Sequence, residues 1–200
     1  MKKFSETLKG ERIELRLLKP TFEIAQITFN EVDKNRDHLL PWMEWASKKE
    51  TKTAEDTFKY LLEVSEKRKK GEHFDYGIFC KNKYLGNIGI FDIDKKEKSS
   101  EKGGWLKKEA TGKGYMTEAV NLLLKEAFEN VGLNRVQSRI DDKNLNSQKA
   151  IKRQGFTYEG ILREAKFIKN ENRWVNFMIF SILKSEWDER KKINNKQKRN

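Results

Sequence analysis

The chain has 200 residues and a formal net charge of +12, with 37% charged and 36% hydrophobic residues. A chain of this length can bury a core without disulfides or metals, and its apolar residues are too regularly spaced for a disordered protein. Its single cysteine excludes an internal disulfide framework. No segment approaches the ~18 apolar residues of a membrane span, and no signal peptide is evident, so we expect a cytoplasmic protein without membrane contact.

Hydrophobic periodicity predicts an alternation of strands and helices. In chain order it predicts a strand at 11–18, helices at 21–32 and 53–70, strands at 76–80, 84–91 and 101–107, a helix between Gly114 and Gly132, a strand at 135–140, a helix at 148–154, and strands at 156–168 and 174–183 joined by a turn at 169–172. Because a helix links the strands at 101–107 and 135–140, these two strands are expected to be parallel. The outer strands are expected to form hairpins, which gives an α/β fold with a mixed sheet.

The sequence Gly112-Lys113-Gly114 lies between a predicted strand and a strongly amphipathic helix. Glycines allow close approach of the backbone, and the first turn of a helix offers free N–H groups, so together they predict a phosphate cradle. A P-loop would need Ser or Thr after the lysine, and a dinucleotide fingerprint would need glycine where Thr117 stands. Neither known cradle fits, and two turn glycines without a ligand remain the alternative.

Asn144 and Ser147 follow the next predicted strand and open a short helix. Ligands bind at the end of a sheet where parallel strands terminate, so this loop should lie beside the glycine loop. Capping of the short helix explains the same two residues without any ligand.

The end of the chain is basic. After Glu189 there is no acidic residue, and the cations are Arg190, Lys191, Lys192, Lys196, Lys198 and Arg199. We expect residues 190–200 to form a disordered tail after a single domain at 1–189. The alternative is an arm that contacts RNA or the ribosome.

Several motifs in order resemble the GCN5-related N-acetyltransferases, the GNAT family, and within it the branch that acetylates the N-termini of ribosomal proteins. The similar stretches are 39–42, 101–106, 112–119, Asn144 with Ser147, 155–164 and 181–187. The resemblance covers about residues 10–187, nearly the whole chain except the tail.

The resemblance implies a mostly antiparallel sheet whose central parallel pair splays around acetyl-CoA, flanked by about four helices. It implies that backbone N–H groups bind the pyrophosphate and that the pantetheine arm lies along the open strand, with no metal. The implied cofactor-binding residues are Leu106, Lys107, Thr111, Gly112, Lys113, Gly114, Tyr115, Met116, Asn144 and Ser147.

Family members transfer the acetyl group by direct attack of an amine on the thioester. Glu101 stands at the position of the family's glutamate, so it is the candidate general base, with a surface charge as the alternative. Many relatives have a tyrosine seven residues after the asparagine, where this chain has Ile151. Ser147 is then the remaining candidate to assist the departing thiolate.

The acceptor is predicted only as a primary amine: the N-terminus of a protein, in particular a ribosomal protein, or a small amine such as a polyamine, an amino acid or an aminoglycoside. Trp42, Trp45 and Trp174 are the candidate substrate-binding residues, with core packing as the alternative. A reading from another class is an RNA- or ribosome-binding module that uses the basic tail. A homodimer is also considered.

Overall fold

The computed structural model describes residues 2–168 and 172–197, and the side chains up to Ile193. The strands are β1 (Thr7–Lys9), β2 (Glu14–Leu17), β3 (Phe74–Cys80), β4 (Lys83–Asp94), β5 (Ser99–Leu106), β6 (Arg135–Asp141), β7 (Thr157–Ile168) and β8 (Arg173–Leu183). The α-helices are α1 (Phe22–Lys34), α2 (Arg36–Leu39), α3 (Ala54–Lys70), α4 (Tyr115–Lys125), α5 (Leu145–Arg153) and α6 (Lys184–Gln197). A π-helix at Glu126–Val131 continues α4.

All eight strands form one sheet in the order β1-β2-β3-β4-β5-β6-β8-β7. Every neighbouring pair is antiparallel except β5 and β6, which are parallel. The mixed, mostly antiparallel sheet with one central parallel pair is therefore confirmed. The crossover between the parallel strands is α4 with its π-helical extension, as the amphipathic pattern predicts.

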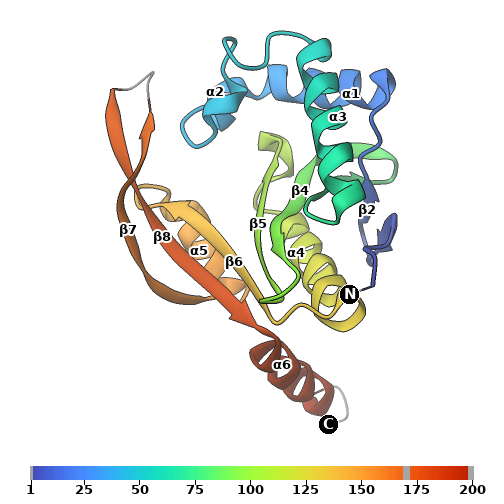
Figure 1. The fold of residues 1–200 in the computed structure, drawn as a ribbon, viewed down its shortest axis with the longest axis vertical. Coiled ribbons are helices and arrows are strands. Elements are labelled where there is room, and N and C mark those ends of the chain that lie inside the picture. The colour runs from blue at the N-terminus through green and yellow to red at the C-terminus, as the bar shows by residue number, and fades with distance from the viewer. Residues whose placement is uncertain (1, 169–171, 198–200) are drawn as a thin grey trace.

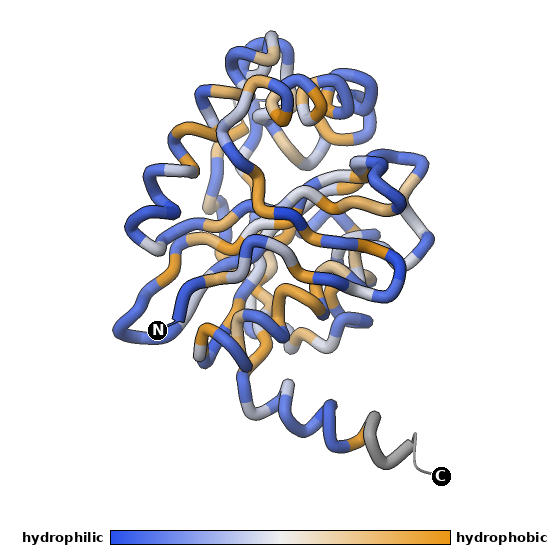
Figure 2. The backbone as a smooth tube through the Cα atoms, turned by 90° about the vertical axis from the view of Figure 1, so that its right-hand side faces the viewer, coloured by the Kyte–Doolittle hydropathy of each residue, from blue (hydrophilic) through white to orange (hydrophobic). Residues whose placement is uncertain are grey.

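Two hydrophobic cores cover the two faces of the sheet. One joins β2, β3, β4 and β6 to α4, the π-helix and Ile151 of α5. The other joins α1, α2 and α3 to the opposite face through side chains such as Tyr84 and Trp105. Figure 1 shows the first three helices grouped at one end of the molecule, and Figure 2 shows the most hydrophobic segments in the sheet and in the helices against it.

Local signals explain where the main helices begin and end. Thr53 and Asp56 form a capping box at the start of α3, and Gly71 ends it in the left-handed conformation with φ of 77°. Gly132 ends the π-helix in the same way, with φ of 87°. The described residues form six α-helices rather than about four, and the two additional ones, the four-residue α2 and the C-terminal α6, carry little periodic signal.

The turn predicted at 169–172 lies mostly outside the described residues; Asn172 itself has a positive φ of 46°. The short strand β1 was missed because it has three residues and only its middle side chain, Leu8, is buried.

Within the tail predicted to be disordered, residues 190–197 form the end of α6, which runs to Gln197, and residues 198–200 lie outside the described part of the chain. The first turns of α6 contact the body of the protein. Trp187 is buried against Phe128 and donates its indole N–H to Glu129 at 2.9 Å. Arg190 donates to the Gln154 carbonyl at 2.6 Å, and Lys191 forms an ion pair with Glu129 at 2.8 Å. None of the described helices is long and apolar enough to span a membrane.

The outermost strand, β7, is irregular. Its pairing with β8 shifts between Leu162 and Lys166, and Glu164 within this bulge has a positive φ of 49°. The Glu164 N–H donates to the side chain of Asn176 on β8 at 2.8 Å, which replaces a regular ladder bond.

Candidate active site

The parallel strands β5 and β6 pair over only three residues. Ser99, Ser100 and Glu101 pair with Arg135, Val136 and Gln137. Beyond these pairs β5 continues to Leu106 and β6 to Asp141, each bonded only to its outer neighbour. Figure 1 shows the two strands diverging from this point. The splay predicted for the central pair is therefore present.

The open edge of β5 carries free backbone groups. The Lys107 N–H donates to the Leu85 carbonyl of β4 at 2.8 Å. Because backbone groups alternate in direction along a strand, those of Gly104 and Leu106 point to the other edge, toward the opening. The Lys107 carbonyl also accepts from Ala110, at 2.9 Å. The backbone groups of Leu106 thus face the opening, whereas both backbone groups of Lys107 are already bonded within the protein; cofactor binding by these two residues stays a prediction.

The glycine loop follows the open end of β5 and ends at the start of α4. Gly112 and Gly114 both have left-handed conformations, with φ of 72° and 80°. The first described bond of α4 runs from the Glu118 N–H to the Gly114 carbonyl, so the preceding N–H groups of Tyr115, Met116 and Thr117 have no acceptor within the helix. No side chain caps this end, and a Cβ on Gly112 would meet nothing within 4 Å. The loop is an open concavity lined by N–H groups.

Arg12, in the turn between β1 and β2, fixes this loop. Its guanidinium donates to the Lys113 carbonyl at 2.9 Å, forms an ion pair with Glu118 at 2.9 Å, and lies 5.2 Å from the centre of the Tyr115 ring. Burial opposes ionisation of Glu118, but hydrogen bonds from Arg12 and Ile13 outweigh it and lower the pKa of Glu118. Sequence reasoning missed Arg12, because nothing in the strand predicted at 11–18 indicates a contact with a loop about a hundred residues away.

A pocket of about 420 Å³ runs along the splay. Its walls come from residues 40–44, the open parts of β5 and β6, the first turn of α4, and α5, and the β7–β8 hairpin closes one side. The lining includes Trp42, Met43, Gly103, Gly104, Met116, Ile140, Asn144, Ser147, Ile151 and Phe177. Met116 therefore connects the glycine loop to the pocket.

Asn144 and Ser147 lie in the pocket wall, as predicted. The Asn144 side chain also accepts a hydrogen bond from the Ser147 N–H at 3.0 Å and so caps α5. The capping role is thus established for Asn144, and it leaves the Ser147 hydroxyl at the pocket. Ile151, one turn later, also lines the pocket and is 2% exposed, so this position supplies an apolar surface rather than an acid.

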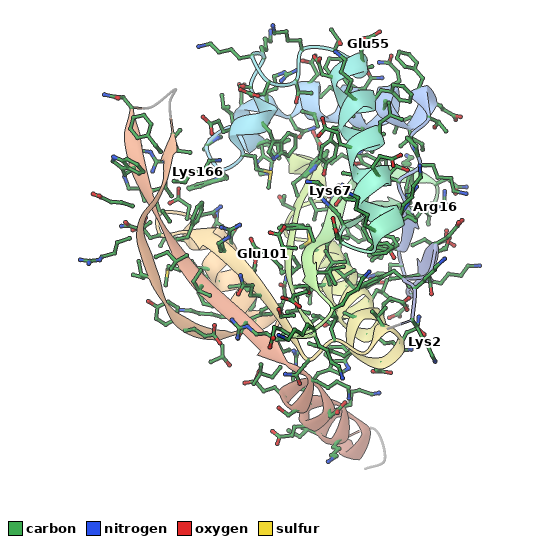
Figure 3. The ribbon with its side chains drawn as sticks, in the orientation of Figure 1. Lys2, Arg16, Glu55, Lys67, Glu101 and Lys166 are labelled. Atoms are coloured by element: carbon green, nitrogen blue, oxygen red, sulfur yellow. The ribbon has the colours of Figure 1, made fainter. Side chains whose placement is uncertain are left out.

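Glu101 is buried at the closed end of the splay. It forms an ion pair with Arg139 on β6 at 2.9 Å and accepts from Gln137 at 3.2 Å. Figure 3 places it between the diverging strands. The pocket wall includes Arg139 but not Glu101. The alternative of a surface charge is therefore wrong, and a direct role as base stays a prediction.

The three candidate tryptophans separate. Trp42 lines the pocket and is 44% exposed. Trp45 lies 6.2 Å from the Trp105 ring instead, because the chain turns after Trp42 and forms a 3-10 helix at Glu44–Ala46. Trp174 packs on Phe167 at 5.1 Å, near the far end of the β7–β8 hairpin. Neither Trp45 nor Trp174 is part of the pocket wall, so the pocket supports Trp42 alone of the three, and substrate binding by any of them stays a prediction.

Four cations line the pocket, and sequence reasoning proposed none of them for the site. They are Lys102, Arg139, Lys166 and Arg173. Lys166 reaches from β7 to Glu44 at 3.3 Å, across the mouth of the pocket, and Figure 3 shows its side chain extending toward the α2 region. Arg173 forms an ion pair with Asp141 at 3.5 Å. The alternation along a strand predicts on which face of the sheet each of these residues lies. It does not predict which other loops and strands come together at that face to form the pocket.

Comparisons with known proteins agree with this geometry. Residues 12–157 match the family model described as the acetyltransferase (GNAT) domain. "Probable N-acetyltransferase YjcK" of Bacillus subtilis is 30% identical over 88% of this chain and 96% of its own length. The "ribosomal-protein-serine acetyltransferase" of Escherichia coli is 26% identical over 87% of this chain and 92% of its own.

Among solved structures, RimL, a ribosomal L7/L12 alpha-N-protein acetyltransferase in complex with coenzyme A, superposes with a TM-score of 0.82 at 21% identity. The match covers 89% of this chain and 98% of that one. The family model and the relatives thus agree with the sheet order, the splayed parallel pair and the glycine loop before α4. This chain belongs to the GNAT family of N-acetyltransferases.

Proposed function

We propose that this enzyme transfers the acetyl group of acetyl-CoA to the N-terminal amine of a protein, in particular a ribosomal protein, by direct attack within a ternary complex. The observation that carries the proposal is the continuity of the glycine loop, the open edge of β5 and the pocket between β5 and β6. The names of the E. coli relative and of RimL support a ribosomal protein as the acceptor.

The residues present fit acetyl-CoA. The N–H groups of residues 112–116 form a concavity suited to a pyrophosphate, because a helix start favours negative charge. The backbone groups of Gly104 and Leu106 face the opening and can bond the amides of a pantetheine arm. Bound acetyl-CoA supplies an activated acyl carbonyl to the pocket.

The chain's own groups then have distinct tasks. The free N–H groups along β5 can donate to the carbonyl oxygen, where negative charge develops during attack. Ser147 can donate a hydrogen bond toward the departing sulfur. Glu101, with Arg139, is the candidate to accept the amine proton, directly or through water. Direct attack within the ternary complex requires no nucleophilic residue of the enzyme.

A small-amine acceptor remains the second candidate, and a polycation is the less suited form of it. The two carboxylates in the pocket wall, Glu44 and Asp141, are already ion-paired with Lys166 and Arg173. A polyamine would have to displace these partners before it found a free negative charge. A protein N-terminus needs only a single amine in the pocket and leaves the rest of the chain outside.

The first experiment is a thermal-shift titration with acetyl-CoA, CoA and NAD. A ligand that binds only the folded state raises the melting temperature. At a hundred times its Kd it adds about 2.7 kcal/mol to the free energy of unfolding. We expect stabilisation by acetyl-CoA and CoA but not by NAD. Peptides with free and with blocked N-termini then test the acceptor. No shift at millimolar CoA would contradict the proposal and favour the RNA-binding alternative.

A further inference from the structure

Lys102 is an unusual residue for the inner end of the pocket. It lies on β5 next to Glu101, the last residue that pairs with β6, and it is 9% exposed. Its ammonium group lies 5.4 Å from the centre of the Phe156 ring. Alternation along β5 places Lys102 on the same face as Gly104 and Leu106, toward α4 and α5.

The other cations of the pocket wall all have acidic partners. Arg139 pairs with Glu101, Lys166 with Glu44 and Arg173 with Asp141. The Lys102 side chain makes no ion pair or hydrogen bond within the described part of the chain, and its contact is with the Phe156 ring. A buried ammonium group without a partner is costly, and a bound anion would offset that cost.

Burial lowers the pKa of Lys102 to about 8, although the neighbouring Glu101 acts in the opposite direction. At neutral pH the group is therefore still mostly protonated and can attract an anion. Its chemistry at this pH is that of a cation in a pocket of low polarity, where a charge-assisted hydrogen bond is strong.

A second polar group of the same pocket wall also lacks a hydrogen-bond partner. Gln154, at the end of α5, lines the pocket and is 2% exposed, and its side-chain oxygen has no hydrogen bond. Rotation of the amide exchanges oxygen and nitrogen, so Gln154 can either accept or donate. Ser138 of β6, buried beside them in the wall, adds a hydroxyl. A cation, an amide and a hydroxyl together suit a carboxylate.

We propose that Lys102, with Gln154 and Ser138, binds the terminal carboxylate of a short dicarboxylic acyl chain, so that the enzyme accepts a carboxyacyl-CoA such as succinyl-CoA. The proposal rests on the function proposed above. A pantetheine arm bonded at Gly104–Leu106 directs its acyl group toward the closed end of the splay. Lys102 lies two residues beyond Gly104, about 7 Å along the strand, which is within reach of a four-carbon chain.

The transfer chemistry is the same for this donor as for acetyl-CoA. The amine forms the new C–N bond with the thioester carbonyl carbon, the C–S bond breaks, and the amine proton ends on the sulfur of the CoA thiol. The terminal carboxylate takes no part in the step and remains on the product. Relative to the protonated amine, the charge of the product is lower by two units, because the ammonium cation is lost and one carboxylate anion is gained.

The experiment compares two acyl donors whose acyl chains both have four carbons, butyryl-CoA and succinyl-CoA, with CoA and acetyl-CoA as references. Binding of CoA, acetyl-CoA, butyryl-CoA and succinyl-CoA to the full chain is measured by calorimetry for the wild type, Lys102→Met and Lys125→Met. Lys125 is an exposed lysine on α4 and serves as the matched control. We expect the wild type and Lys125→Met to bind succinyl-CoA at least tenfold more tightly than butyryl-CoA, and Lys102→Met to lose that preference while still binding CoA.

Three results would overturn the inference. If the wild type binds succinyl-CoA no more tightly than butyryl-CoA, the protein has no carboxylate site of this kind. Persistence of the preference in Lys102→Met assigns it to another residue. Steady-state kinetics with a carboxylate-bearing amine supply the third result: an effect of Lys102→Met confined to the KM of that amine assigns the site to the acceptor. Failure of CoA itself to bind the wild type is a different outcome, because it contradicts the proposed function and this inference with it.

Discussion

At the scale of single residues, a comparison of two glycines can distinguish the effect of backbone strain from the effect on ligand binding. Gly112 and Gly132 have similar left-handed conformations, and a Cβ on either would meet nothing within 4 Å. Gly112 lies in the loop before α4, whereas Gly132 ends the π-helix away from the loop. Any difference between alanine substitutions at the two positions therefore reports the space above the loop rather than the backbone.

We expect Gly112→Ala and Gly132→Ala each to lower the free energy of unfolding by about 1 kcal/mol, because L-residues disfavour this conformation. Only Gly112→Ala should weaken acetyl-CoA binding, by about tenfold, since its methyl group would displace a phosphate from charge-assisted hydrogen bonds. Denaturant melts and calorimetry measure the two effects. Equal affinity in the two variants would exclude the loop as the phosphate site.

The second residue-scale prediction concerns Glu101. If its carboxylate accepts the amine proton, Glu101→Gln should reduce kcat/KM by about a hundredfold or more and remove the acidic limb of the pH–rate profile. Binding of CoA should remain, because Glu101 is not part of the pocket wall. A reduced rate with an unchanged pH profile would instead mean that Glu101 only positions Arg139.

At the scale of elements, one carboxylate ties together the three strands at the end of the sheet. Glu159 on β7 receives two hydrogen bonds from Arg135 on β6, both at 2.6 Å, and one from Ser181 on β8 at 2.6 Å. The hydrogen bonds from Arg135 are the main cause that lowers the pKa of Glu159 to about 2; burial acts against them.

We expect Glu159→Gln to lower the free energy of unfolding at pH 7 by about 1 kcal/mol, a value reduced for the exposure of this pair. A lowered folded-state pKa gives stability that is complete above the unfolded pKa, near 4.5, and is lost as the pH falls toward 2. The difference between wild type and variant should therefore shrink across this window. A difference that is constant with pH would contradict the ionic origin.

The attachment of α6 is a second prediction at this scale. Trp187→Ala should cost about 3 kcal/mol, because it removes a buried ring and leaves Glu129 without its indole donor. Ile193→Ala on the same helix should change stability by less than ~0.5 kcal/mol, since that side chain is exposed. Chemical denaturation of both variants tests whether α6 is docked through Trp187.

At the scale of the whole molecule, the sheet has two parts joined by a short parallel contact. Strands β1–β5 form one part and β6, β8 and β7 the other, and only three residue pairs connect them. A ligand between β5 and β6 would contact both parts. We expect CoA to slow amide hydrogen exchange in residues 102–106 and 138–141 more than in β2 and β3, as measured by mass spectrometry. Uniform protection would indicate binding elsewhere.

How far the sequence predicts this molecule depends on the distance over which each signal acts. The parallel pair, the glycine loop and the cap at Asn144 follow from local patterns, and all are present. Arg12, Lys102 and Gln154 could not be assigned, because their importance comes from contacts between distant segments. Trp174 was chosen by residue type alone, and the geometry of the hairpin that carries it, which the sequence does not give, places it outside the pocket wall.

The bulge in β7 has a consequence for the behaviour of the protein in concentrated solution. An outer strand of twelve residues exposes a row of unpaired backbone groups, on which another chain could add a strand. The shift between Leu162 and Lys166 interrupts that row, and charged side chains flank the interruption. The strand therefore offers two short, differently twisted templates instead of one long flat one, which opposes polymerisation through the sheet edge.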